Sequence, residues 1–100
     1  MSARLTVILW RDIPAQVVVK SGDETLKIEL PPRFQQAVDR AAMRAGAIGT
    51  DEYLEDWRRE SRQCPDNLEE EVQAEAAEID ARFTIEVLNE YVLNNGYRGE

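Results

Sequence analysis

The chain has 100 residues and a formal net charge of −8, because 20 Asp and Glu side chains outnumber 12 Lys and Arg side chains. Hydrophobic residues make up 43% of the sequence and charged residues 32%, a mixture typical of one globular domain and not of a disordered chain. Histidine is absent and Cys64 is the single cysteine, which excludes Ser–His and Cys–His hydrolases and zinc sites built from Cys and His. We therefore expect no catalytic residue of these classes, no metal site and no cofactor.

The amino-terminal segment and the cysteine content predict a cytoplasmic protein. The apolar run within residues 1–10 is too short for a signal peptide, and no stretch approaches the ~20 apolar residues of a membrane span. A single cysteine forms no internal disulfide, which favours a reducing compartment. We therefore expect no association with a membrane.

Three segments within residues 4–30 have the composition of β-strands. Residues 4–10 are mainly β-branched or large apolar side chains, as in a strand that is covered on both faces. Residues 15–20 contain three consecutive valines, and residues 25–30 alternate between polar and apolar side chains. Because a parallel crossover needs about a dozen residues, the short connections favour antiparallel neighbours. The sequence predicts a three-stranded antiparallel sheet.

Two helices are expected within residues 32–62. Pro32 is well suited to the first helical position, and apolar side chains then recur every three or four residues until Gly46, the expected helix stop. Thr50 is a suitable N-cap for a second helix, which has acidic residues in its first turn. We expect this second helix to end near residue 62.

Residues 66–95 predict one long, acidic, amphipathic helix. Its apolar side chains repeat every three or four residues without an intervening glycine or proline. A straight helix over residues 68–95 would be about 42 Å long, which exceeds the roughly 34 Å diameter of a compact chain of this size. The helix must therefore bend, with residues 80–84 as the expected place, or extend past the domain toward a partner. The predicted architecture is one α+β domain over residues 1–100.

The negative charge is concentrated at the carboxyl-terminal end. Residues 1–62 contain ten basic and ten acidic side chains, so the whole charge of −8 lies in residues 63–100. A solvated helix face accounts for this distribution, and a dock for a basic partner surface is the alternative. The sign and the distribution of the charge both disfavour binding to nucleic acid.

The candidate partner-binding residues come from two strings, at residues 10–16 and 53–59, and from the apolar side of the last helix. These candidates are Trp10, Arg11, Asp12, Trp57, Arg58, Val87 and Tyr91. Core packing by the aromatic rings, with Asp12 capping a turn, is one interpretation of the first string. The alternative is a recognition patch on a rigid corner of the sheet.

Four strings that occur in order resemble the small bacterial virulence factor domain family. They are LWRDIPAQV at residues 9–17, LPPRF at 30–34, AAMRAG at 41–46, and the segment 50–58 with its Tyr, Leu, Trp and Arg. The resemblance covers residues 4–60. The name of this family reflects a phenotype and implies no mechanism, so the resemblance assigns no catalytic residue to this chain. The resemblance implies a stand-alone protein or a module attached to a larger protein. It also implies an association with tetrahydrofolate and corrinoid methyl-transfer enzymes.

These observations predict a non-catalytic accessory or adaptor subunit. Its expected partner is a cytoplasmic metabolic enzyme of tetrahydrofolate- or corrinoid-linked one-carbon (methyl) transfer, or a second copy of the chain. The alternative is a small ligand-binding protein or enzyme that uses Asp12, Arg11 and Arg58 to hold a folate-like anion. A third hypothesis is a regulatory domain whose last helix imitates an acidic polymer.

Overall fold

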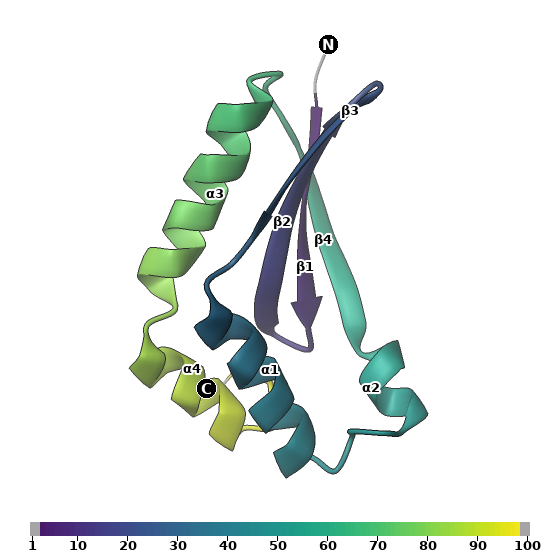
Figure 1. The fold of residues 1–100 in the computed structure, drawn as a ribbon, viewed down its shortest axis with the longest axis vertical. Coiled ribbons are helices and arrows are strands. Elements are labelled where there is room, and N and C mark those ends of the chain that lie inside the picture. Colours follow the sequence, from purple (N-terminus) through teal and green to yellow (C-terminus); the bar gives the residue numbers. More distant parts are fainter. Residues whose placement is uncertain (1–2, 99–100) are drawn as a thin grey trace.

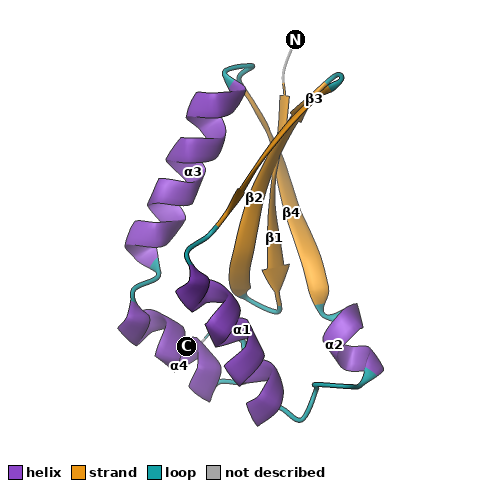
Figure 2. Ribbon diagram, in the orientation of Figure 1, coloured by secondary structure: helices purple, strands orange, loops and turns teal. Residues whose placement is uncertain are grey.

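The computed structural model describes residues 3–98, and this part of the chain has the predicted α+β architecture (Figures 1 and 2). The strands are β1 (Ala3–Trp10), β2 (Ile13–Ser21), β3 (Glu24–Glu29) and β4 (Trp57–Cys64). The helices are α1 (Pro32–Arg44), α2 (Asp51–Glu55), α3 (Leu68–Arg82) and α4 (Ile85–Leu93). The molecule is elongated, with extents of 43 × 28 × 24 Å.

The sheet has four strands in the order β3-β2-β1-β4, and every neighbouring pair is antiparallel. The three predicted strands and their antiparallel pairing are confirmed, but the prediction of a three-stranded sheet is wrong, and so is the prediction of a helix up to residue 62. The helix that follows Thr50 ends at Glu55, and the chain continues as β4 along the free edge of β1. Pairing there satisfies the backbone groups of β1 that would otherwise be left without partners, which outweighs the helical propensity of this charged segment.

The predicted single long helix is also wrong, because α3 and α4 are separated at Phe83 and Thr84. The side-chain oxygen of Thr84 caps α4 by accepting a hydrogen bond from the Val87 amide at 3.3 Å. Arg33 of α1 donates to the Phe83 carbonyl at 3.0 Å, so a free carbonyl at the end of α3 gains a partner. The break lies within residues 80–84, where a bend was predicted.

Most of the acidic side chains of the predicted long helix lie on α3 and fewer on α4. α3 carries six carboxylates and one arginine, whereas α4, with the sequence IEVLNEYVL, is mainly apolar and has two glutamates. An acidic last helix is therefore not shown, because most of the predicted acidic side chains belong to α3. No helix in the described part of the chain has the length and apolar content needed to cross a membrane.

The helices cover only one face of the sheet. α3 packs along that face, α1 and α4 close the end of the sheet that holds the β1–β2 turn, and the short α2 precedes β4 (Figure 1). The core between α3 and the sheet contains Leu5, Val17, Val19, Val72 and Ile79, all at most 2% exposed. Within residues 3–98, no helix covers the opposite face of the sheet over most of its length, so the expectation that β1 is covered on both faces is wrong.

Candidate functional site

The string Trp10-Arg11-Asp12 forms the tight turn between β1 and β2, and most of it is buried. Trp10 is 0% exposed, and its indole Nε1 donates to the carbonyl of Tyr53 at 2.9 Å. Arg11 is 8% exposed and has a positive φ of 55°, a backbone conformation unfavourable for a residue with a side chain. Trp10 and Arg11 are thus placed for packing and not on a surface that a partner could reach.

Arg11 joins three segments that are distant in the sequence. Its guanidinium carbon lies 4.6 Å from the centroid of the Trp10 ring and 4.8 Å from that of Tyr97. Its Nε donates to Asp56 Oδ2 at 2.9 Å, and its Nη1 donates to the Asn95 carbonyl at 2.8 Å. We call Trp10, Arg11, Asp12, Asp56 and residues 94–98 the turn clasp, because these contacts fix the turn, the start of β4 and the carboxyl-terminal segment together.

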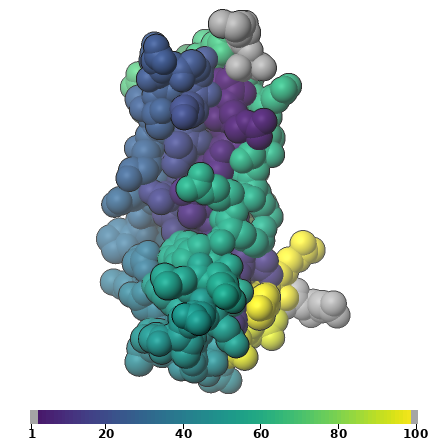
Figure 3. All heavy atoms as spheres, turned by 90° about the vertical axis from the view of Figure 1, so that its right-hand side faces the viewer, coloured from purple at the N-terminus to yellow at the C-terminus, as the bar shows by residue number. Residues whose placement is uncertain are grey.

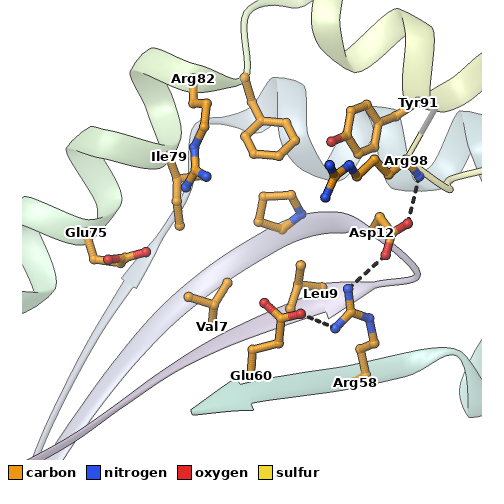
Figure 4. Close-up of a pocket in the computed structure, with 12 residues that line it drawn as sticks. Val7, Leu9, Asp12, Arg58, Glu60, Glu75, Ile79, Arg82, Tyr91 and Arg98 are labelled. Carbon is orange, nitrogen blue, oxygen red and sulfur yellow. Dashed lines mark hydrogen bonds and ion pairs between the residues drawn. The ribbon is translucent and has the colours of Figure 1, made fainter. Parts of the chain in front are cut away.

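Three of the predicted residues, Asp12, Arg58 and Tyr91, meet at a cavity of about 210 Å³ between the sheet, α3 and α4 (Figure 4). Asp12 Oδ1 accepts from Arg58 Nη2 at 2.8 Å, and Asp12 Oδ2 accepts from the backbone amide of Arg98 at 2.7 Å. Arg58 also donates to Glu60. The hydrogen bond to Glu60, and then the one to Asp12, raises the pKa of Arg58. Arg58 is thus bound to two carboxylates of its own chain.

Two further arginines, which the sequence did not indicate, extend their guanidinium groups toward this cavity from opposite sides (Figure 4). Arg82 has its nearest carboxylate partner, Glu78, at 3.9 Å, and Arg98 forms no side-chain ion pair with another residue of the range 3–98. Apolar lining is supplied by Val7, Leu9, Pro14, Ile79 and Phe83. Three carboxylates, those of Asp12, Glu60 and Glu75, also line the cavity and are bound by Arg58 and Arg62, so Arg82 and Arg98 are the groups that could hold a small anion. Arg82 and Arg98 lie far from β1 in the sequence, so no local pattern linked them to Asp12.

The uncovered side of the sheet is a second candidate site, which Figure 3 shows facing the viewer. The strand registers place alternate residues of all four strands on it. We call this surface the open face and define it as Arg4, Thr6, Ile8, Gln16, Val18, Lys20, Thr25, Lys27, Glu29, Trp57, Arg59, Ser61 and Gln63. Ile8 and Val18 are half-buried among the neighbouring strands of this face, and Trp57, at the end of the face, is half-buried against Tyr53 of α2.

The open face is hollowed at its end next to α1 and α2. A hollow of about 300 Å³ is lined by Ile8, Gln16 and Trp57 together with arginines of β4. A second hollow, of about 440 Å³, shares Gln16 and Trp57 and reaches Gln35 of α1. Trp57 therefore separates two adjoining depressions, and it is the predicted candidate residue that a partner could reach from this side.

The remaining predicted features carry less chemistry. Val87 is half-buried on α4, and it lines neither the cavity nor the hollows. Cys64 is buried at the end of β4, and burial, followed by the charge of Glu71, raises the pKa of its thiol. Within residues 3–98, no group of three His, Cys, Asp or Glu side chains is arranged to hold a metal ion.

Comparisons with known proteins identify the family of the chain. Searches of the curated proteins and of the solved structures found no match. The model of the virulence factor family matches residues 8–92, a range that extends from the end of β1 to α4 and includes the β1–β2 turn, β4 and α3. On this match over most of its length, the chain belongs to the virulence factor family.

Proposed function

We propose that the chain is a non-catalytic accessory subunit that binds a cytoplasmic metabolic enzyme through the open face of its sheet. The observation that carries this proposal is the one-sided cover of the sheet. An antiparallel sheet can present one face to water, but such a face is normally polar. Here the uncovered face contains the apolar side chains of Ile8 and Val18, and the aromatic ring of Trp57 lies at its end next to α2. Burial of these side chains by a partner would be favourable.

The chemistry of the other candidate site supports binding more than catalysis. The carboxylates of Asp12 and Glu60 are held by Arg58, and Glu75 is held by Arg62 at 3.0 Å. Each of these carboxylates is already bound to an arginine of the same chain, which leaves it fewer free oxygen positions for a substrate. The family resemblance makes enzymes of tetrahydrofolate- or corrinoid-linked methyl transfer the first partners to test.

The proposal is tested by affinity capture from the cytosol of the source cell with two matched variants. Arg59→Glu reverses one exposed charge on the open face, and Arg82→Glu makes the same change next to the cavity, away from that face. The expected result is one metabolic enzyme, recovered in near-equal amount with the wild type and Arg82→Glu but reduced at least about tenfold with Arg59→Glu.

Two outcomes would contradict the proposal. In the first, folded wild-type protein recovers no enzyme in comparable amount. In the second, Arg82→Glu loses the enzyme while Arg59→Glu retains it, which would place the contact on the side of α3. Circular dichroism of both variants establishes that each change leaves the fold intact.

A second candidate function is the binding of a small anion in the cavity. It is favoured by the guanidinium groups of Arg82 and Arg98, which extend toward the cavity: the nearest carboxylate to Arg82 is Glu78 at 3.9 Å, and Arg98 forms no side-chain ion pair within residues 3–98. The volume of about 210 Å³ suits one carboxylate-bearing group, since sites for drug-sized ligands span about 300–1,000 Å³. Stabilisation of the wild type by folates in a thermal-shift panel, lost in Arg82→Glu and kept in Arg59→Glu, would support this function.

A further inference from the structure

Resting on the proposed function, we infer that the segment of the partner bound at the open face is acidic and carries an apolar side chain. Four cations, Arg4, Lys20, Lys27 and Arg59, lie on this face, and Glu29 is its single carboxylate. The open face thus has a net charge of +3 in a chain whose net charge is −8. This inversion of sign sets the surface apart from the rest of the molecule and calls for a partner of negative charge.

The cations of the open face are exposed and form no ion pair with the part of the chain that the structure describes. Within residues 3–98, the ion pairs involve Arg11, Arg33, Arg58, Arg62 and Arg82, and none of the four cations of the open face. The other arginines of β4, at positions 58 and 62, point to the covered side and are paired there. The unpaired charge is therefore confined to one side of the strand.

Two of these cations face each other directly. The β1–β2 register places Arg4 opposite Lys20, and like charges at directly opposed positions of a sheet are destabilising. Lys27 lies on β3 one residue pair away, opposite Val18. A carboxylate-bearing segment laid across β1 and β2 would remove this repulsion. The structure therefore contains an unfavourable charge arrangement that an acidic ligand relieves.

The hollow beside Trp57 provides the apolar part of the recognition. Its volume of about 300 Å³ is sufficient for one aliphatic or aromatic side chain, and Ile8 and Trp57 supply apolar walls. Gln16 adds an amide that can bond to a backbone group. Central apolar anchors surrounded by charged pairs are the usual arrangement of a protein interface.

An acidic protein segment fits this surface better than a nucleic acid does. Single-stranded nucleic acids are held by exposed aromatic rings on which bases stack. The aromatic side chain of the open face is Trp57, which is half-buried and packs edge-on against Tyr53 with ring centroids 6.2 Å apart. The six carboxylates of α3 on the other side of the sheet would repel a long polyanion.

The test is an NMR titration of the full chain with three defined probes. The first is a synthetic peptide with one leucine between two runs of glutamate, the second has glutamine in place of every glutamate, and the third is an oligothymidylate of equal length. We expect the glutamate peptide to shift resonances of Thr6, Val18 and Ser61, and the glutamine peptide to shift them at least about tenfold less at equal concentration. Raising the salt from about 50 mM to about 300 mM should weaken the binding.

The variant Lys20→Glu tests whether the glutamate peptide binds at the cations of the open face. It should reduce peptide binding at least about tenfold, and it should also raise the unfolding temperature by about 1–6 °C because Arg4 then faces a carboxylate. Loss of binding in a more stable protein excludes unfolding as the cause. The inference is overturned if no probe binds the open face, if the glutamine peptide binds equally well, if the oligothymidylate binds more tightly, or if Lys20→Glu binds normally.

Two combinations of results separate the recognition of an acidic segment from the role as an accessory subunit. An enzyme captured through the open face, together with a negative peptide titration, would retain the accessory role and reject the acidic segment. Binding of the glutamate peptide without any captured enzyme would retain the acidic recognition and reject the metabolic partner.

Discussion

The two faces of the sheet are built from the same strands and differ in what covers them. Val17 on β2 points to α3 and is 0% exposed, whereas its neighbour Val18 lies half-buried on the open face. The covered face gathers the large aliphatic core, and the cations on its β4 side are paired with carboxylates. The open face keeps four cations without ion pairs in the described chain. The difference indicates that one face holds the fold together while the other is available for a partner.

The largest effect is expected at the turn clasp, where Gly96 fits closely against Trp10. A Cβ at Gly96, which has a φ of +93°, would lie 2.8 Å from Trp10 Cζ3. Gly96→Ala should therefore lower the free energy of unfolding by about 3 kcal/mol, through backbone strain and overlap together. The control is Gly22→Ala, which shares the positive φ but has open space around its Cβ, and should cost about 1 kcal/mol. Equal losses in urea denaturation would contradict the account of the clasp.

The two valines test the difference between the faces directly. Val17→Ala should cost about 2 kcal/mol, because it removes two methyl groups from a close-packed core. Val18→Ala should cost less than about 1 kcal/mol in the isolated protein, because no helix packs on that side chain. A larger loss at Val18 than at Val17 would show that the open face is part of the core.

The boundary between α3 and α4 gives an intermediate prediction. Thr84→Ala removes the oxygen that accepts from the Val87 amide at the first turn of α4. We expect a loss of about 1 kcal/mol in the free energy of unfolding, the usual effect of removing an N-cap. Thr84→Ser retains the acceptor and should restore most of the stability. No difference between Ala and Ser at this position would show that the cap has no role in the helix break.

The smallest effect concerns Cys64 at the end of β4. Burial raises the pKa of its thiol in the folded protein above the pKa in the unfolded chain. The neutral thiol therefore stabilises the fold fully at a pH below the unfolded pKa, and this stabilisation is lost as the pH rises through the folded pKa. Alkylation by iodoacetamide should accordingly reach its half-maximal rate at a higher pH in the folded chain than in urea. An equal or lower midpoint in the folded chain would contradict this placement of Cys64.

The sequence predicted local structure well where local chemistry decides it. The alternation of residues 25–30 and the proline and glycine that bound α1 correspond to β3 and to the observed helix. Residues 57–62 were predicted as helix because Thr50 and the acidic residues after it are typical of a helix start, although the Thr50 side chain makes no capping hydrogen bond. The partner that makes residues 57–64 a strand is β1, more than 40 residues away. Such non-local pairing leaves no local periodicity to detect.

The candidate sites were predicted only in part for the same reason. The three residues Asp12, Arg58 and Tyr91 come together at one cavity, although they belong to a turn, a strand and a helix. Trp10 and Arg11 were predicted as partner-binding residues, but both are buried: Trp10 donates to the Tyr53 carbonyl, and Arg11 contacts Asp56 and the Asn95 carbonyl. The open face appears only once the strand registers are known, since its cations lie on all four strands.

Binding of the partner enzyme to the open face is tested most directly by a methyl NMR spectrum of the chain, recorded with and without the enzyme recovered by affinity capture. Ile8 and Val18 report on the open face, while Val17 and Val72 report on the side covered by α3. If the enzyme binds the open face, we expect the methyl resonances of Ile8 and Val18 to shift when it is added and those of Val17 and Val72 to stay in place. Shifts confined to Val17 and Val72 would contradict it and place the contact on the helical side.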